Sequence, residues 1–130
     1  MSAIPASFEA KGSFPCDRDG FVQAQAFLEA RIDDPKPAVI MDEIVSNIVR
    51  CSGAGVFTLQ FRNRDDGALE MTFGDDGVPF DPTTEIAQPD VRASAADRPI
   101  GGLGMFMVRK MAKSVVYRRE GGLNVLTVVL

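Results

Sequence analysis

The sequence predicts an α/β protein, a two-layer α/β sandwich whose mixed, mostly antiparallel sheet carries its helices on one face. Three observations lead to this fold class. Apolar residues recur with helical spacing in three segments, they alternate with polar residues in four others, and tight-turn residues join the alternating segments in pairs. The expected order is two helices, a β-hairpin, a long loop, a third helix and a second hairpin. The 130 residues fit one domain with a sizeable core.

The first two helices are expected over residues 20–31 and 35–51. Before the first, an Asp-Arg-Asp segment supplies an N-cap candidate. Before the second, Asp34 can cap while Pro35 stands in the first turn, an arrangement that favours helix initiation. Apolar residues three or four positions apart mark the core faces: Phe21, Ala24, Leu28 and Ile32 in the first helix, and Ile40, Ile44 and Ile48 in the second.

Two β-hairpins are expected, one on each side of the long loop. The first turns at an Asp-Gly pair, which is a strong hairpin signal, and the second turns at a Gly-Gly pair. A further edge strand is expected before the first helix, although Lys11 and Gly12 interrupt its pattern. The expected strands are residues 7–14, 56–62, 68–73, 114–119 and 123–130.

The composition is typical of a globular protein, with 45% apolar and 25% charged residues. The net charge is −4, so the chain lacks the excess of positive charge that is typical of nucleic-acid-binding proteins, and we expect no direct contact with nucleic acid. The chain has no run of about 18 apolar residues and no signal-peptide pattern, so we expect a cytoplasmic protein without membrane contact. Its two cysteines fit a reduced compartment. Histidine is absent, which excludes histidine catalysis and a phosphoacceptor histidine within these residues.

A glycine turn feeds the third helix over residues 98–111. The free N–H groups and the positive dipole end of such a helix start suit a phosphate group. The alternative is a tight turn that serves close helix packing. The spacing predicts that Gly104, Met107, Val108 and Met111 share the core face and that Arg109 and Lys110 are solvated. Met105 is expected opposite the core face, either as a partner surface or as a flank that neighbouring structure covers.

The second helix carries Glu43 and Asn47, four residues apart and therefore neighbours on its surface. Asn47 falls beside the apolar stripe, where an unpartnered amide would cost about 1–3 kcal/mol. The functional interpretation is that Asn47 ligates Mg²⁺ through oxygen and that Glu43 acts as a base or orients a water molecule. The alternative is an ordinary polar pair at the edge of the core.

An acidic, glycine-containing segment, residues 75–82, follows directly after an expected strand. One carboxylate there can accept a hydrogen bond from an exocyclic amine such as that of adenine, and Gly77 would let a ring approach the backbone. The alternative is a charged surface turn. After it, residues 83–99 show no periodicity, and a loop of this length in a small domain is typically a functional lid or a disordered segment.

These three clusters, in this order, resemble the characteristic boxes of the GHKL ATPase superfamily, which includes gyrase, Hsp90, histidine kinases and MutL. They are most similar to its small branch, the anti-sigma-factor serine/threonine kinases of the SpoIIAB and RsbW type. Residues 43–47 match the first box, residues 75–82 the second and residues 98–104 the third. The tail over residues 115–126 is similar to the closing hairpin of this branch, and the resemblance spans about residues 34–130.

The resemblance implies a Bergerat ATP-binding fold in a single domain over residues 1–130, with an ATP lid at about residues 83–100. It also implies a site for ATP and Mg²⁺. In that site, Asn47 binds Mg²⁺ and Glu43 is the general base or positions the attacking hydroxyl. The adenine amine is contacted by Asp75, and the phosphates by backbone N–H groups. The remaining implied site residues are Gly77 beneath the adenine and Gly101, Gly102, Leu103 and Gly104 at the phosphates.

The function implied by the resemblance is that of an anti-sigma-factor serine/threonine protein kinase. Members of the branch phosphorylate a Ser or Thr on a STAS-type antagonist, bind a sigma factor or analogous regulator, and are often homodimers. The missing histidine and the length of the chain argue against a sensor histidine kinase and against gyrase- or MutL-type ATPases. The alternative function is a non-catalytic nucleotide-binding or partner-sequestering module, and a third interpretation is a globular domain with no nucleotide site.

One departure from the branch follows the first box. The branch often carries a His or a Lys-His pair shortly after the Asn, whereas this chain reads Arg50, Cys51 and Ser52. Arg50 either supplies positive charge near the phosphates or is an ordinary surface arginine.

Overall fold

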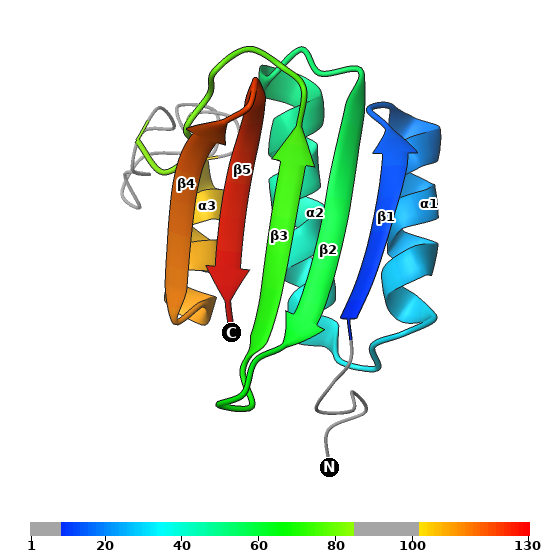
Figure 1. The fold of residues 1–130 in the computed structure, drawn as a ribbon, viewed down its shortest axis with the longest axis vertical. Coiled ribbons are helices and arrows are strands. Elements are labelled where there is room, and N and C mark those ends of the chain that lie inside the picture. The colour runs from blue at the N-terminus through cyan, green and yellow to red at the C-terminus, as the bar shows by residue number, and fades with distance from the viewer. Residues whose placement is uncertain (1–8, 85–101) are drawn as a thin grey trace.

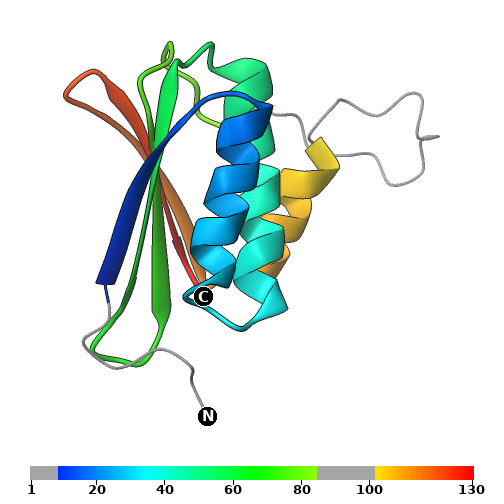
Figure 2. The ribbon, with the colours of Figure 1, turned by 90° about the vertical axis from the view of Figure 1, so that its right-hand side faces the viewer.

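A computed structural model describes residues 9–84 and 102–130 and shows one sheet covered by three helices on a single face. Figure 2 shows the sheet edge-on, with the helices packed against one side and the opposite side left open. This arrangement confirms the predicted two-layer α/β class. None of the helices that the structure describes is long and apolar enough to cross a membrane.

The sheet has five strands in the order β1-β2-β3-β5-β4, and every pairing between them is antiparallel. The two hairpins and the edge strand expected from the sequence are therefore all present. The expected strand over residues 7–14 begins at Glu9, because residues 7 and 8 lie outside the described part of the chain. In chain order the elements are β1 (Glu9–Pro15), α1 (Arg18–Glu29), α2 (Pro35–Cys51), β2 (Val56–Asn63), β3 (Leu69–Asp75), α3 (Gly102–Met111), β4 (Ser114–Glu120) and β5 (Leu123–Val129).

Side-chain caps start the first two helices at aspartates that the sequence offers, although α1 begins and ends two residues earlier than the expected range of 20–31. The Asp17 carboxylate accepts a hydrogen bond from the Gly20 N–H at 2.8 Å, and Asp34 accepts one from the Lys36 N–H at 3.0 Å. Pro35 stands in the first turn of α2, where its missing N–H costs nothing. The bounds of α2 are those expected from the sequence.

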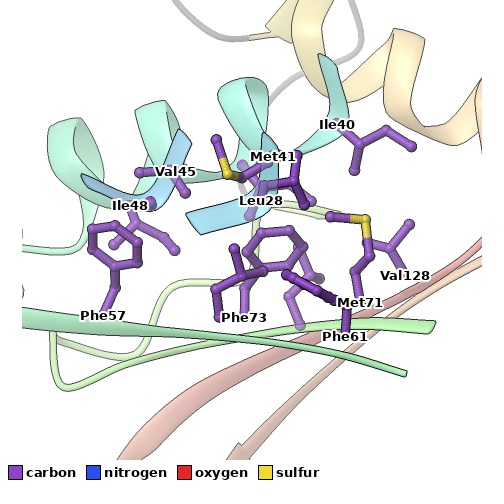
Figure 3. Close-up of a cluster of buried hydrophobic side chains, with 14 of the residues drawn as sticks. Leu28, Ile40, Met41, Val45, Ile48, Phe57, Phe61, Met71, Phe73 and Val128 are labelled. Carbon is purple, nitrogen blue, oxygen red and sulfur yellow. The ribbon is translucent and has the colours of Figure 1, made fainter. Parts of the chain in front are cut away.

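The core lies between the helices and the sheet, as Figure 3 shows. Phe57, Phe61 and Phe73 rise from the central strands and are fully buried beneath α1 and α2. The ring of Phe14 packs on Phe57 with centroids 5.5 Å apart. The isoleucines predicted for the core face of α2, Ile40, Ile44 and Ile48, are all buried.

The predicted core face of α3 is wrong by part of a turn. Met107, expected inside, is 45% exposed, whereas Met105 is only 3% exposed, which agrees with a covered flank and not with a free partner surface. Because α3 packs sideways on α2 and also contributes to the core above the sheet, its buried arc comprises Gly104, Met105 and Val108. Amphipathic spacing identifies a helix, but only its neighbours decide which arc is covered.

Candidate functional site

The predicted clusters meet at one end of the molecule, the upper end in Figure 1. The last turns of α2, the end of β3 and the start of β5 all lie there. A cavity between them is lined by Asn47 of α2, Asp75 of β3, Met105 of α3 and Asn124 of β5. Its free volume is about 20 Å³, which is room for about one water molecule. A purine base is larger, so a nucleotide needs this cavity to widen.

Asn47 brings an incompletely paired amide to this cavity. Its side chain is 2% exposed, and its Oδ1 accepts a hydrogen bond from the Arg50 guanidinium at 3.1 Å. Its Nδ2 has no hydrogen-bond partner within the described residues. Leaving a buried donor unpaired costs about 1–3 kcal/mol, and a ligand with an acceptor group would remove that cost.

Asp75 presents a carboxylate to the same cavity and is 6% exposed. Its Oδ1 accepts two hydrogen bonds at 3.0 Å, one from the Gly77 N–H and one from Asn124 Nδ2. Neither bond uses Oδ2, and no other residue in the described ranges donates to that oxygen. Asp75 therefore has one oxygen held by the protein and one available as an acceptor.

The neighbouring Asp76 has a different role. Its Oδ1 accepts hydrogen bonds from the Gly55 N–H at 2.8 Å and the Val56 N–H at 3.2 Å, and these tie the end of β3 to the start of β2. The backbone N–H groups of Val56 and Gly55 stabilise the charged carboxylate and hold the pKa of Asp76 below its ordinary value of 3.8. Of the two adjacent aspartates, only Asp75 lines the cavity.

Gly77 occupies a position that admits no side chain. A Cβ there would overlap the Ser52 carbonyl oxygen and lie 2.7 Å from the Ser52 Cβ. The same carbonyl accepts a hydrogen bond from the Val78 N–H at 2.9 Å. Arg119 adds a further tie, because its guanidinium donates to the Gly77 carbonyl at 2.8 Å. The glycine lets the segment after β3 lie directly on the end of α2.

Glu43 lies against the start of α3. A Cβ at Gly104 would overlap the Glu43 carboxylate, so the two helices approach closely at this point. Glu43 also lines an open groove of about 500 Å³ between α1 and α2, together with Arg18 and Arg50. The carboxylate is thus reachable from solvent, as a group that handles protons must be.

The remaining predicted phosphate-binding residues are only partly described. Gly102 and Leu103 form the first residues of α3, whereas Gly101 lies outside the described residues. Of the predicted lid, residues 83–100, only Thr83 and Thr84 are described. Arg109, expected to be solvated, is exposed but also donates to the Thr83 carbonyl at 2.6 Å.

Three further residues belong to the site although no motif in the sequence predicts them: Asn124, Tyr117 and Arg119. Asn124 had a detectable signal, because it is a polar residue on the core face of β5, in register with buried Leu126 and Val128. Arg119 gave no comparable signal, since one arginine in an exposed hairpin is unremarkable.

The donor set near Asn47 fits a magnesium ion only in part. No group of three or more His, Cys, Asp or Glu residues capable of holding a metal occurs in residues 9–84 and 102–130. Asn47 Oδ1 is a hard oxygen donor of the kind that Mg²⁺ prefers, and because it accepts a hydrogen bond from Arg50 here, an ion ligated by it would displace the Arg50 guanidinium. An ion bound here would complete its shell with water and phosphate oxygens, which is the usual arrangement in nucleotide sites.

Comparison with known proteins gives one family match. The family model described as a histidine kinase-like ATPase domain matches residues 22–130. A search of curated proteins found no match. Among solved structures, the chain is similar to the histidine kinase domain of a blue-light activated histidine kinase from Erythrobacter litoralis, with 13% identity and a TM-score of 0.49. That alignment covers 97% of this chain, which spans 64% of the other.

Proposed function

The chain belongs to the family of histidine kinase-like ATPase domains, and we infer that it is an anti-sigma-factor serine/threonine protein kinase. It binds ATP, as its family membership indicates. In our proposal it transfers the γ-phosphate to a Ser or Thr of a STAS-type antagonist. It also binds a sigma factor or analogous regulator, in the manner of a partner switch, and forms a homodimer.

One observation carries the nucleotide site in this proposal. The unpaired Nδ2 of Asn47 and the available Oδ2 of Asp75 line the same cavity although they come from different elements. The first offers a donor and the second an acceptor, and a nucleotide with phosphate oxygens and an exocyclic amine satisfies both. Asp75 binds the adenine amine in this proposal, and Gly77 lies beneath the ring.

The phosphates lie toward the start of α3 in our proposal. The N–H groups of Gly102, Leu103 and Gly104 are assigned to them, as suits a glycine-rich helix start. Gly101, which lies outside the described residues, is assigned to them by the resemblance alone. Asn47 holds Mg²⁺, which neutralises phosphate charge when bound. The lid is the segment over residues 83–100.

Glu43 is the residue we assign to proton transfer. Its carboxylate lies at Gly104, beside the proposed phosphates, and faces the open groove from which an acceptor can approach. In the transfer, the acceptor oxygen bonds to the γ-phosphorus, the bond to the β-phosphate oxygen breaks, and ADP leaves. Glu43 orients the acceptor hydroxyl and takes its proton.

The choice of a Ser or Thr acceptor rests on the three boxes, the closing tail and the composition. No histidine occurs among the 130 residues, so a phosphoacceptor histidine is not one of them. An acceptor on a separate protein is consistent with this composition. A serine or threonine is the acceptor implied by the small branch that the boxes resemble.

The second candidate function is a non-catalytic module that binds nucleotide or sequesters a partner. The small free volume of the cavity, about 20 Å³, favours only the partner-sequestering form of this candidate, because the cavity does not admit a base without widening. The two candidates differ in whether phosphate reaches a partner.

Calorimetry tests the nucleotide site first. We expect the wild type to bind ATP in the presence of Mg²⁺, binding to weaken with EDTA, and Asn47→Ala to lose the metal-dependent part. No binding by folded wild-type protein would contradict the proposal. Transfer is then measured with ATP labelled in its γ-phosphate and a panel of purified STAS-domain proteins. Binding without transfer to any of them would favour the non-catalytic module.

A further inference from the structure

The side-chain amide of Asn124 makes every hydrogen bond that an amide can make, in the one orientation that the structure shows. Its Oδ1 accepts from the Tyr117 hydroxyl at 2.6 Å and from the Phe80 N–H at 3.1 Å. Its Nδ2 donates to Asp75 Oδ1 at 3.0 Å and to the Val78 carbonyl at 2.8 Å. An amide offers two acceptor sites and two donor hydrogens, so all four are occupied.

The neighbours of Asn124 fix which way the amide points. Two donors lie on its oxygen side and two acceptors on its nitrogen side. A flipped amide would set its oxygen against the Asp75 carboxylate and the Val78 carbonyl and its nitrogen against the Phe80 N–H, whereas the Tyr117 hydroxyl can donate or accept and adds a bond in the observed orientation. Because Asn124 is 4% exposed, water does not compensate for such a mismatch.

This orientation determines how Asp75 faces the cavity. The Gly77 N–H and Asn124 Nδ2 both donate hydrogen bonds to Asp75 Oδ1. The Asp75 carboxylate therefore cannot rotate without breaking two hydrogen bonds to a charged acceptor. Oδ2 then remains as an acceptor with a fixed direction. Tyr117, Asp75 and Asn124 all line the cavity, so the network forms part of its wall.

We propose that Asn124, held by Tyr117, is the positioning residue that gives the pocket its preference for a base with an exocyclic amine. This inference rests on the proposed nucleotide site and assigns its base selectivity to a residue outside the three boxes. The fixed acceptor of Asp75 pairs with an amine and repels a carbonyl oxygen at the same place. Asn124 acts only through Asp75.

The experiment compares ADP with purine riboside diphosphate, which has the same phosphates and ring system but lacks the exocyclic amine. Calorimetry measures both affinities for the wild type, Asn124→Ala, Asn124→Thr and Tyr117→Phe. Thr127→Ala is the matched control, because Thr127 lies on the same strand but off the core face, away from the cavity. Circular dichroism confirms that each variant is folded.

We expect the wild type to prefer ADP and Asn124→Ala to lose about tenfold in ADP affinity, since a hydrogen bond to a charged group contributes roughly that much. The affinity of Asn124→Ala for purine riboside diphosphate should stay close to that of the wild type, so the preference for ADP should largely disappear. Asn124→Thr, which keeps one donor, should restore part of it. Tyr117→Phe should reduce the preference for ADP over purine riboside diphosphate about threefold, because the Asn124 amide loses the hydrogen bond that Tyr117 donates to it. A merely structural role would weaken both ligands equally.

Three results would overturn the inference. An unchanged preference in Asn124→Ala is the first, and if that variant does not fold, an unchanged preference in Tyr117→Phe decides instead. Equal wild-type affinity for the two ligands is the second, and it leaves nucleotide binding intact. Failure of the wild type to bind either ligand is the third, and it overturns the proposed function as well.

Discussion

Gly104 in the first turns of α3 lies against the carboxylate of Glu43 on α2, so closely that an added Cβ would overlap the carboxylate and stand 2.6 Å from the Glu43 Cδ. This contact joins two clusters that are far apart in the sequence. It places an acidic group beside the helix start that we assign to the phosphates. The absence of a side chain at position 104 is therefore tied to the position of the proposed base.

Gly104→Ala tests this relationship. The overlapping atoms are the far end of a flexible side chain, so Glu43 can move aside while the backbone stays in place. We expect unchanged or slightly raised stability, since alanine is favoured over glycine in a helix by up to about 1 kcal/mol. Phosphate transfer should fall while ATP affinity remains. Met107→Ala, an exposed change in the same helix, is the control. Full transfer activity in Gly104→Ala would contradict the assignment of Glu43.

Glu43→Ala removes the proposed base directly. Because the proposed contacts to the nucleotide are made by other residues, ATP binding measured by calorimetry should stay close to wild type. Transfer of labelled phosphate to a STAS-domain acceptor should fall by about 10²–10⁴-fold, the usual contribution of general acid–base catalysis. Loss of binding together with transfer would show that Glu43 holds the nucleotide instead.

Asn47→Leu separates stability from binding. It replaces a buried amide with one unpaired donor by an apolar side chain of similar size. We expect the free energy of unfolding of the ligand-free protein to rise by about 1 kcal/mol. Binding of ATP with Mg²⁺ should be lost. Urea denaturation and calorimetry measure the two effects. Because the change also removes the hydrogen bond from Arg50 to Asn47 Oδ1, Arg50→Ala is the control, and an Asn47→Leu variant that is less stable than Arg50→Ala would mean that the Nδ2 is satisfied in the folded protein.

Gly77→Ala should destabilise the fold whether or not a nucleotide binds. The new Cβ meets the backbone carbonyl of Ser52, which cannot move aside as a flexible side chain can. We expect a loss of about 1–3 kcal/mol in the free energy of unfolding. The control is Gly55→Ala, because the nearest atom to a Cβ there is 3.8 Å away. Equal stability of the two variants would disprove the steric role of Gly77.

Asp76→Asn should destabilise the protein near neutral pH but not in acid. The pKa of Asp76 is lowered in the folded state, so its contribution is fully present above its ordinary value of 3.8 and is lost as the pH falls through the lower folded value. The difference in unfolding free energy between wild type and variant should therefore shrink below pH 3.8. Urea denaturation over a pH series measures it. Asp65→Asn, in the exposed turn, is the control, and a difference that is constant with pH would refute the prediction.

Most elements of the fold follow from local sequence patterns. The caps at Asp17 and Asp34 and the glycine turn at Gly121 and Gly122 act over a few residues, and the structure has the predicted elements in these places. The residues that line the cavity cannot be predicted from such local patterns. Asn124 pairs with Asp75 across neighbouring strands, and no spacing rule connects positions so far apart.

The sequence by itself determined the α/β class, the order of the helices and strands, and the segments that carry Glu43, Asn47 and Asp75. Periodicity, caps and turns depend on neighbours within a few residues, so one chain is enough to read them. Only the tertiary structure decided which arc of α3 is buried, that Gly104 touches Glu43, and that Asn124 orients Asp75. These features arise from how separate elements pack, and packing depends on all of their surfaces together.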